Sequence, residues 1–279
     1  MNLETQKSLA HAFRAMHHGG NTLVLPNVWD VASARVIEEA GFAALATTSA
    51  GIAFSLGYPD GQKISRDEML ARVARITKAV HVPLTADAES GYGPRPEDAA
   101  HTAQGVVEAG AAGMNLEDGT GDAAHPLADL SLQLERIHAI REAALRTGVL
   151  LVLNARTDVY LDQVGPPEAR YDEAVKRGLA FRDAGADCIF VPGVRDPETI
   201  RRLVSDLQCP INVLVGPGSP SVPELRQMGV ARVSLGSAVM RASLGLVRKI
   251  AEELQSAGTY ASLEGAPSHA GCNQLFSRT

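Results

Sequence analysis

The sequence predicts an α/β fold of the (β/α)8 class, a TIM barrel, on three observations. First, a glycine that ends a helical pattern and precedes a short apolar run recurs at Gly41, Gly110, Gly185 and Gly229. Second, four further apolar runs of strand length make eight strands that alternate with amphipathic segments. Third, the alternation extends over about 250 residues, the length that such a barrel requires.

Each element follows from its local pattern. Strands are expected where apolar runs are short and bounded by turn residues, at 22–25, 43–47, 83–86, 112–116, 150–155, 188–191, 211–214 and 232–235. Helices are expected near 31–40, 66–80, 96–109, 130–146, 170–184, 197–207, 222–228 and 238–257. Ser65 and Glu68 form a capping box at the start of the second helix. A doubly wound sheet would have fewer strands and a glycine-rich turn after the first one, where this chain has Pro26 and Asn27.

The chain is expected to form a single barrel domain over residues 1–279. No segment between 20 and 258 has the composition of a linker. Residues 5–18 predict an extra leading helix, and the tail from 262 to 279, which is rich in small and polar residues, is expected to be mobile or to lie on a neighbour.

Composition excludes several classes of partner. The net charge is −6 and no basic stripe is present, which argues against nucleic acid and against an anionic membrane surface. The three cysteines are odd in number and lack CxxC spacing, so neither a disulfide framework nor a zinc site is predicted. No run has the length needed to cross a bilayer, and the first 20 residues lack the apolar core of an export signal. We therefore expect a cytoplasmic protein whose partner is a small molecule or another protein subunit.

Carboxylates end two of the predicted strands. Asp87 and Glu89 are two residues apart, so in a strand they would point to the same face, and Glu117 ends the next strand. Acidic groups at the ends of buried strands are costly unless a cation or hydrogen-bond donors meet them. The sequence therefore predicts one shared Mg²⁺ or Mn²⁺ site, with helix N-caps as the alternative reading.

Other polar or aromatic residues close the remaining strands, where the active site of a barrel lies. Burial of Arg156 inside the barrel is unfavourable without an anionic partner, which would be a substrate carboxylate or, in a structural role, Asp158 or Glu117. Tyr92 is the expected spare proton donor. The other candidates at the mouth are Trp29, Thr48, Ser49, Ala50 and Asn212.

Five segments together resemble one known superfamily. They are LPNVWD at 25–30, SLGYPDG at 55–61, DAESGYG at 87–93, NLED at 115–118 and NARTD at 154–158. Their identity and order resemble the isocitrate lyase and phosphoenolpyruvate mutase superfamily.

The resemblance implies specific roles. Asp87 would ligate Mg²⁺ directly, and Asp60, Glu89 and Glu117 would hold its waters. Backbone N–H groups of Thr48, Ser49 and Ala50 would face the oxygen of a 2-oxo acid, and Arg156 would take its carboxylate in a fork. It also implies chemistry through an enolate, and a homotetramer, a dimer of dimers in which dimers exchange the last barrel helix, here near 238–257.

One loop departs from the superfamily. Residues 119–127 read GTGDAAHPL and lack the Lys and Cys that the lyases carry there, and the Lys and Asn of the mutases. The expected function is therefore a Mg²⁺-dependent lyase that cleaves or decarboxylates a small 2-oxo or 2-hydroxy acid, such as an oxaloacetate-like substrate. Two alternatives stay open: phosphonopyruvate hydrolase or mutase chemistry at a carbon–phosphorus bond, and a 2-oxo acid binding protein without catalysis.

Overall fold

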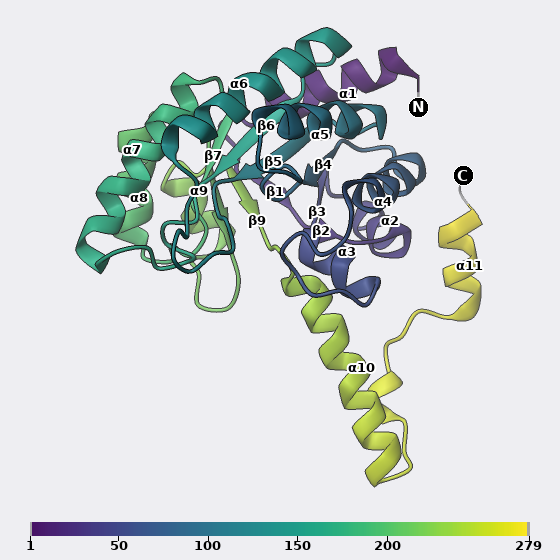
Figure 1. The fold of residues 1–279 in the computed structure, drawn as a ribbon. Helices are drawn as coiled ribbons and strands as arrows, with labels where there is room; N and C mark the ends of the chain where they lie inside the picture. The colour runs from purple at the N-terminus through teal and green to yellow at the C-terminus, as the bar shows by residue number, and fades with distance from the viewer. Residues whose placement is uncertain (1, 278–279) are drawn as a thin grey trace.

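The computed structural model describes residues 2–277, in which parallel strands close into a barrel surrounded by helices (Figure 1). The order of neighbouring strands is β1-β9-β8-β7-β6-β5-β4-β3-β2. The strands are β1 (Leu23–Leu25), β2 (Asn27–Val28), β3 (Leu45–Thr47), β4 (Leu84–Asp87), β5 (Gly113–Glu117), β6 (Val152–Arg156), β7 (Cys188–Phe190), β8 (Ile211–Leu214) and β9 (Arg232–Ser234). The barrel class predicted from the sequence is confirmed.

The helices alternate with these strands in the predicted order. They are α1 (Leu3–Met16), α2 (Val31–Glu39), α3 (Ser49–Ser55), α4 (Arg66–Ala79), α5 (Pro96–Glu108), α6 (Leu130–Thr147), α7 (Arg170–Asp183), α8 (Pro197–Leu207), α9 (Val222–Gln227), α10 (Ala238–Ser256) and α11 (His269–Ser277). Two short 3₁₀ turns lie at Pro167–Ala169 and Ala261–Leu263. The four glycines of the recurring phrase all adopt positive φ angles, between 85° and 107°, as expected of left-handed residues at helix ends.

The first barrel strand is divided in two, which the apolar pattern did not predict. Pro26 separates β1, which pairs with β9, from β2, which pairs with β3. Proline has no N–H to donate to a ladder, so the pairing changes partner at this residue. Asn27 joins the seam: its side-chain amide donates to the Thr47 carbonyl at 2.7 Å, and its Oδ1 accepts from the N–H groups of Leu235 and Gly236 at 2.7 and 2.8 Å.

Helix α1 closes the end of the barrel where the strands begin. Phe13 is fully buried, and a Cβ built on Gly113, the first residue of β5, would lie 2.9 Å from its ring. The predicted extra leading helix therefore exists, at residues 3–16, and it closes the barrel end opposite the carboxyl ends of the strands. Within residues 2–277 no helix is long and apolar enough to span a bilayer.

The last two helices leave the body of the barrel. In Figure 1, α10 projects away from the strands, and Met240 in its first turn is its one buried residue. The tail, which was expected to be mobile or to lie on a neighbour, contains the helix α11. The Leu275 carbonyl of α11 accepts from Arg35 of α2 at 2.9 Å, so α11 packs on the same chain. Residues 278–279 of the predicted tail lie outside the described residues.

Candidate active site

A cavity of about 250 Å³ lies at the carboxyl ends of the barrel strands. This is the end where barrel enzymes carry their active sites. Its lining combines predicted and unpredicted residues: Asn27, Thr48, Ser49, Ala50, Asp60, Asp87, Asn115, Arg156, Leu161, Phe190, Pro192, Leu214, Arg232, Ser234, Gly236, Ser237 and Arg241.

Asp87, the last residue of β4, is oriented by three donors. Its Oδ2 accepts from the backbone N–H and the hydroxyl of Ser49 at 2.9 and 2.8 Å, and its Oδ1 accepts from the Asn115 amide at 3.3 Å. The Asp87 N–H donates to the Thr47 hydroxyl at 2.8 Å. A carboxylate has about four lone-pair sites, so Asp87 retains capacity to bind a cation on its cavity side.

Glu89 reaches this region by a different route from the one the sequence suggested. The prediction that Asp87 and Glu89 point to the same face of one strand is wrong, because β4 ends at Asp87 and Glu89 has a φ of +49°. Its carboxylate accepts from the Gln62 N–H at 2.6 Å and from the Tyr92 hydroxyl at 2.9 Å. Non-glycine residues in the left-handed region are uncommon and often occur at functional sites. Here the turn directs the carboxylate back toward the loop that carries Asp60.

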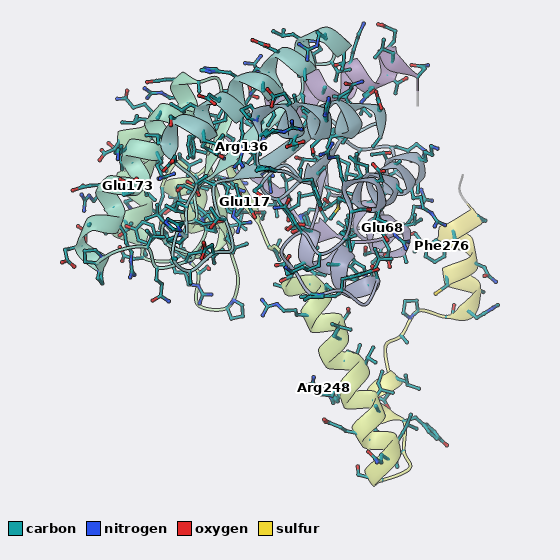
Figure 2. The ribbon with its side chains drawn as sticks, viewed as in Figure 1. Glu68, Glu117, Arg136, Glu173, Arg248 and Phe276 are labelled. Atoms are coloured by element: carbon teal, nitrogen blue, oxygen red, sulfur yellow. The ribbon has the colours of Figure 1, made fainter. Side chains whose placement is uncertain are left out.

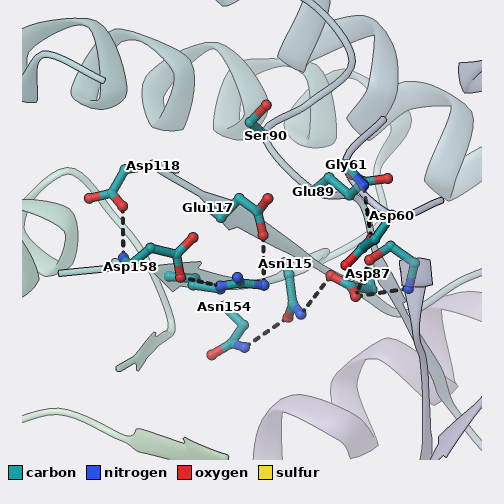
Figure 3. A network of polar contacts seen from close by, with 12 residues as sticks. Asp60, Gly61, Asp87, Glu89, Ser90, Asn115, Glu117, Asp118, Asn154 and Asp158 are labelled. Carbon is teal, nitrogen blue, oxygen red and sulfur yellow. Dashed lines mark hydrogen bonds and ion pairs between the residues drawn. The ribbon is translucent and has the colours of Figure 1, made fainter. Parts of the chain in front are cut away.

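Arg156 ends β6 between two carboxylates. Its Nη1 lies 2.7 Å from Glu117 Oε2 and its Nε lies 2.6 Å from Asp158 Oδ1 (Figure 3). Burial alone would lower the pKa of Arg156, but Glu117 and Asp158 together raise it. The structural partners considered for this arginine are thus both present, and Nη2 is the guanidinium nitrogen to which no side chain among residues 2–277 is bonded.

Asp60 approaches from the loop after α3, at the exposed mouth of the cavity. Its Oδ1 accepts from the Gly61 N–H at 3.0 Å. Figure 3 shows Asp60 beside Asp87, with Glu89 close by and Glu117 facing them. Four carboxylates from three segments of the chain therefore lie near one another, and two of them, Asp60 and Asp87, line the cavity.

The protonation of these carboxylates reflects burial and mutual repulsion. Burial, followed by the charge of Asp87, raises the pKa of Glu89 to about 7. Burial also raises the pKa of Glu117 well above its usual range, despite Arg156, and raises the pKa of Asp60 with a contribution from Asp87. Carboxylates that repel one another in this way gain from a nearby cation.

The four carboxylates suit a Mg²⁺ ion that is held partly through bound water molecules better than one that is ligated only by side chains. Among the described residues, no three His, Cys, Asp or Glu side chains converge closely enough to ligate one ion together. Mg²⁺ keeps several waters and commonly takes one or two carboxylates directly. Asp87 and Asp60 line the cavity, whereas Glu89 and Glu117 are outside its lining.

The turn after β3 begins a short helix, α3, that the sequence did not predict. Thr48 is its N-cap, and its side chain accepts from the Gly51 N–H at 3.3 Å. The Ser49 N–H is bonded to Asp87. Ala50 is the second residue of the helix, where an N–H has no intrahelical partner, and it lines the cavity.

Five predicted site residues lie outside the cavity lining: Glu89 and Glu117, whose contacts are given above, and Asn212, Trp29 and Tyr92. Asn212 is fully buried and exchanges hydrogen bonds with the Ser234 hydroxyl, at 3.2 and 3.3 Å. Trp29 packs beside Gly51 of α3, behind the cavity wall. Tyr92 lines a separate open groove with Gln62 and Arg66, and its hydroxyl is held by Glu89.

The loop at 119–127 supplies no side chain to the cavity lining. An antiparallel bridge between Gly119 and Leu127 closes it into a hairpin. His125, its one histidine, is 83% exposed and faces Asp122 at 3.4 Å. It is a surface residue of the loop.

Sequence reasoning missed Asn115, Arg232, Arg241 and the apolar side chains of Leu161 and Phe190. Asn115 is two residues before Glu117, so alternation along β5 could have identified it. Arg232 was included in the predicted strand 232–235, which the structure has at Arg232–Ser234, but it was not identified as a site residue. Leu161 and Phe190 carry no chemical signal that distinguishes them from core residues.

Comparison with known proteins decides the family. The family model described as phosphoenolpyruvate phosphomutase matches residues 13–255. The chain belongs to this family. It is thereby an enzyme of the isocitrate lyase and phosphoenolpyruvate mutase superfamily, whose members include carbon–carbon lyases, as the motifs indicated.

Relatives in the superfamily catalyse several reactions. The 2-methylisocitrate lyase of Salmonella typhimurium is 30% identical over 261 residues, which is 90% of this chain and 86% of that protein. An oxaloacetate acetylhydrolase solved with its product oxalate is 28% identical, with a TM-score of 0.86 over 97% of this chain and 94% of that one. A phosphonopyruvate hydrolase solved with oxalate and Mg²⁺ shares the fold at 24% identity, with a TM-score of 0.83 over 95% and 94% of the two chains.

Proposed function

We propose that this protein is a Mg²⁺-dependent lyase that cleaves or decarboxylates a small 2-oxo or 2-hydroxy carboxylic acid through an enolate. The observation that carries the proposal is the 250 Å³ cavity, in which Asp87, the first turn of α3 and Arg156 face one space. The loop at 119–127 lacks the Lys and Cys expected of the methylisocitrate type. This favours an oxaloacetate-like substrate.

Asp87 would hold the ion directly, and Asp60, Glu89 and Glu117 would hold its waters. When bound, Mg²⁺ supplies a Lewis acid for negative charge on the substrate oxygen. The residues that orient Asp87, which are Ser49 and Asn115, keep its carboxylate at the cavity wall.

The remaining residues bind and orient the guest. Arg156 donates from Nη2 to the substrate carboxylate, since its other two nitrogens are held by Glu117 and Asp158. The N–H of Ala50, with Ser49 and the capping residue Thr48, faces the oxygen on which charge develops. Tyr92 holds Glu89, and burial followed by the charge of Glu89 raises the pKa of its phenol, so it remains a donor. Trp29 and Asn212 support the wall from behind.

Decarboxylation of an oxaloacetate-like acid then requires no side-chain base. The bond between the third and fourth carbons breaks, CO₂ leaves, and its electron pair moves to the carbonyl oxygen to give the enolate of pyruvate. Protonation of the third carbon by water completes the reaction. Donors directed at the oxygen where charge develops lower the barrier to the first step.

A turnover screen tests this proposal. Oxaloacetate, substituted malates and phosphonopyruvate are offered to the full chain with Mg²⁺ and with EDTA, and we expect release of pyruvate or a related oxo acid that EDTA abolishes. Turnover of phosphonopyruvate alone would support the carbon–phosphorus alternative. Calorimetric binding of an oxo acid without product would support the binding protein, and turnover unaffected by EDTA would exclude the mechanism.

We also propose that the protein is a homo-oligomer in which α10 packs on a second copy of the chain. Four apolar side chains of this projecting helix are about half exposed or more, namely Leu244, Leu246, Val247 and Leu254, and Figure 2 shows the helix standing clear of the barrel at Arg248. An apolar helix face of this kind is stable in water when covered. Light scattering of the wild type and of a Val247→Glu variant tests this, with a lower mass expected for the variant.

A further inference from the structure

Arg232 is a charged side chain in the interior of the barrel. It lies on β9 in register with Leu23 of β1 and Asn212 of β8, and it is 1% exposed. Ser234, two residues further along the same strand, lines the cavity beside it. Residues two apart on a strand share a face, so the guanidinium is directed inward, toward the cavity.

The described residues do not neutralise this charge. Arg232 Nη2 lies 3.5 Å from Asn115 Oδ1, at the limit of a hydrogen bond, and Nε and Nη1 have no partner among residues 2–277. The central carbon of the Arg232 guanidinium lies 6.0 Å from the centre of the Phe13 ring. Burial lowers the pKa of Arg232 to about 10, so the side chain is still a cation at neutral pH.

Two other buried arginines, Arg177 and Arg35, are paired with carboxylates, whereas Arg136 donates to the backbone carbonyls of Gly93 and Pro94. Arg177 meets Asp118 at 3.0 Å and Glu173 at 2.8 Å. Arg35 meets Glu38 at 3.3 Å and donates to two backbone carbonyls. A buried cation without a counterion is unfavourable unless an anion meets it, and the space that Arg232 touches is the cavity.

We infer that Arg232 binds the second carboxylate of the substrate, so that the enzyme selects dicarboxylates over monocarboxylates of the same length. This inference rests on the proposed function, because the first carboxylate and the oxo group are assigned to Arg156 and to the side of the cavity around Asp87. A cavity of 250 Å³ has room for about eight water-sized units of about 30 Å³. That volume suits a small dicarboxylate.

The chain places the two arginines at separate positions around the cavity. Arg156 is on β6 and Arg232 is on β9, with β7 and β8 between them in the sheet order. A guest held at both would cross the cavity past Phe190 of β7 and Leu214 of β8, which supply apolar contact for its carbon chain.

Calorimetry with a matched pair of ligands tests the inference. 2-Oxoglutarate and 2-oxovalerate have the same chain length and differ by the terminal carboxylate. With Mg²⁺ present, we expect the wild type to bind 2-oxoglutarate at least 30-fold more tightly, which is about 2 kcal/mol. Arg232→Met should abolish this preference and change the affinity for 2-oxovalerate by less than about threefold, whereas Arg232→Lys should retain part of the preference.

Thermal unfolding separates binding from a structural role. If Arg232 serves the ligand, Arg232→Met should raise the melting temperature of the free protein, because it replaces an unpaired buried charge by an apolar chain of similar length. The matched control is Arg35→Met, which removes a paired buried arginine away from the cavity. It should lower the melting temperature and leave the ligand preference unchanged.

The contrary outcomes are distinct. Equal binding of both ligands by the wild type, or a preference that survives in Arg232→Met, overturns the inference and leaves the proposed function standing. A variant Arg232→Met that melts lower or does not fold shows that the guanidinium holds the core, and also overturns it. If the wild type binds neither 2-oxo acid with Mg²⁺, the proposed function fails together with the inference.

Discussion

The two sides of the cavity treat charge in opposite ways. On the acidic side, which consists of Asp60, Asp87, Glu89 and Glu117, carboxylates crowd together, and Arg156 is held between Glu117 and Asp158. On the β9 side, Arg232 is buried with no counterion among the described residues. The first side has negative charge to offer a cation, and the second has positive charge to offer an anion. A dicarboxylate substrate bound together with a metal ion would match both sides, because the metal ion meets the acidic residues and a carboxylate meets Arg232.

The largest effect should come from the acidic side. Asp87→Asn keeps the shape of the side chain and removes its charge, so we expect kcat/KM to fall by about 1000-fold, or about 4 kcal/mol in the barrier. Steady-state kinetics on the substrate found by the turnover screen measures this. Asp122→Asn, an exposed aspartate of the neighbouring loop, is the control and should retain wild-type kinetics. A mild defect in Asp87→Asn would contradict the assignment of this residue to the metal.

The next largest effect is a difference in stability between variants of Arg156 and Arg232. Arg156→Met leaves Glu117 and Asp158 without their partner, so we expect the free energy of unfolding to fall by about 3 kcal/mol, opposite in sign to Arg232→Met. Denaturant titration of both variants gives the comparison. Arg146→Met, which removes an exposed contact at 4.0 Å, should change stability by less than about 1 kcal/mol. If Arg156→Met and Arg232→Met change the free energy of unfolding in the same direction, the two sides of the cavity do not differ in how their arginines are paired.

Asn27 joins the two sides at the barrel seam. Its hydrogen bonds to Thr47 on one flank and to Leu235 and Gly236 on the other are buried or partly buried. Asn27→Ala should therefore cost about 2 kcal/mol of folding free energy. Asn27→Asp keeps the acceptor and loses the donor, so it should fall between the wild type and Asn27→Ala. If Asn27→Ala unfolds at the wild-type denaturant concentration, the seam is held by other contacts.

The smallest effect concerns pH. The pKa of Glu89 is raised from 4.5 to about 7 by burial and by Asp87, so without a cation the folded chain binds more protons than the unfolded chain between these values. Stability from this group therefore falls as pH rises through that window. Mg²⁺ favours the ionised form, so its affinity should rise with pH, by at most about tenfold per unit for one proton released, and level off above about pH 7. Calorimetry in two buffers of different ionisation enthalpy measures the proton release, and zero release at pH 6 would contradict this account.

The sequence predicted the barrel well because its signals are local. Glycine at helix ends and short apolar runs placed the predicted helices and strands of the barrel within about two residues of their observed bounds. The split at Pro26 was missed because it depends on which strand the backbone meets at the seam. The short helix α3 was also missed, although its N-cap, Thr48, is a local signal. Helix α11 was missed because its contact with Arg35 lies 240 residues away in the chain.

The candidate site was predicted in part. Asp87, Asp60, Arg156 and the turn at 48–50 line one cavity, because strand ends of a parallel barrel meet at one face. The pairing of Arg156 with Glu117 and Asp158 depends on side-chain geometry, and the left-handed turn at Glu89 depends on backbone geometry. The spacing of residues in the sequence specifies neither. Arg232 was placed in the predicted strand 232–235 but not in the site, because it begins the strand and the site candidates were taken from the residues that end each strand.

A crystal structure with Mn²⁺ in place of Mg²⁺ and a bound 2-oxo dicarboxylate tests the central claim most directly. We predict one anomalous peak about 2.2 Å from an Asp87 carboxylate oxygen. The 2-oxo group of the ligand should lie beside this peak, and the far carboxylate of the ligand should lie within hydrogen-bond distance of Arg232. A cavity that holds no metal at Asp87, or a guest bound away from it, would contradict the account.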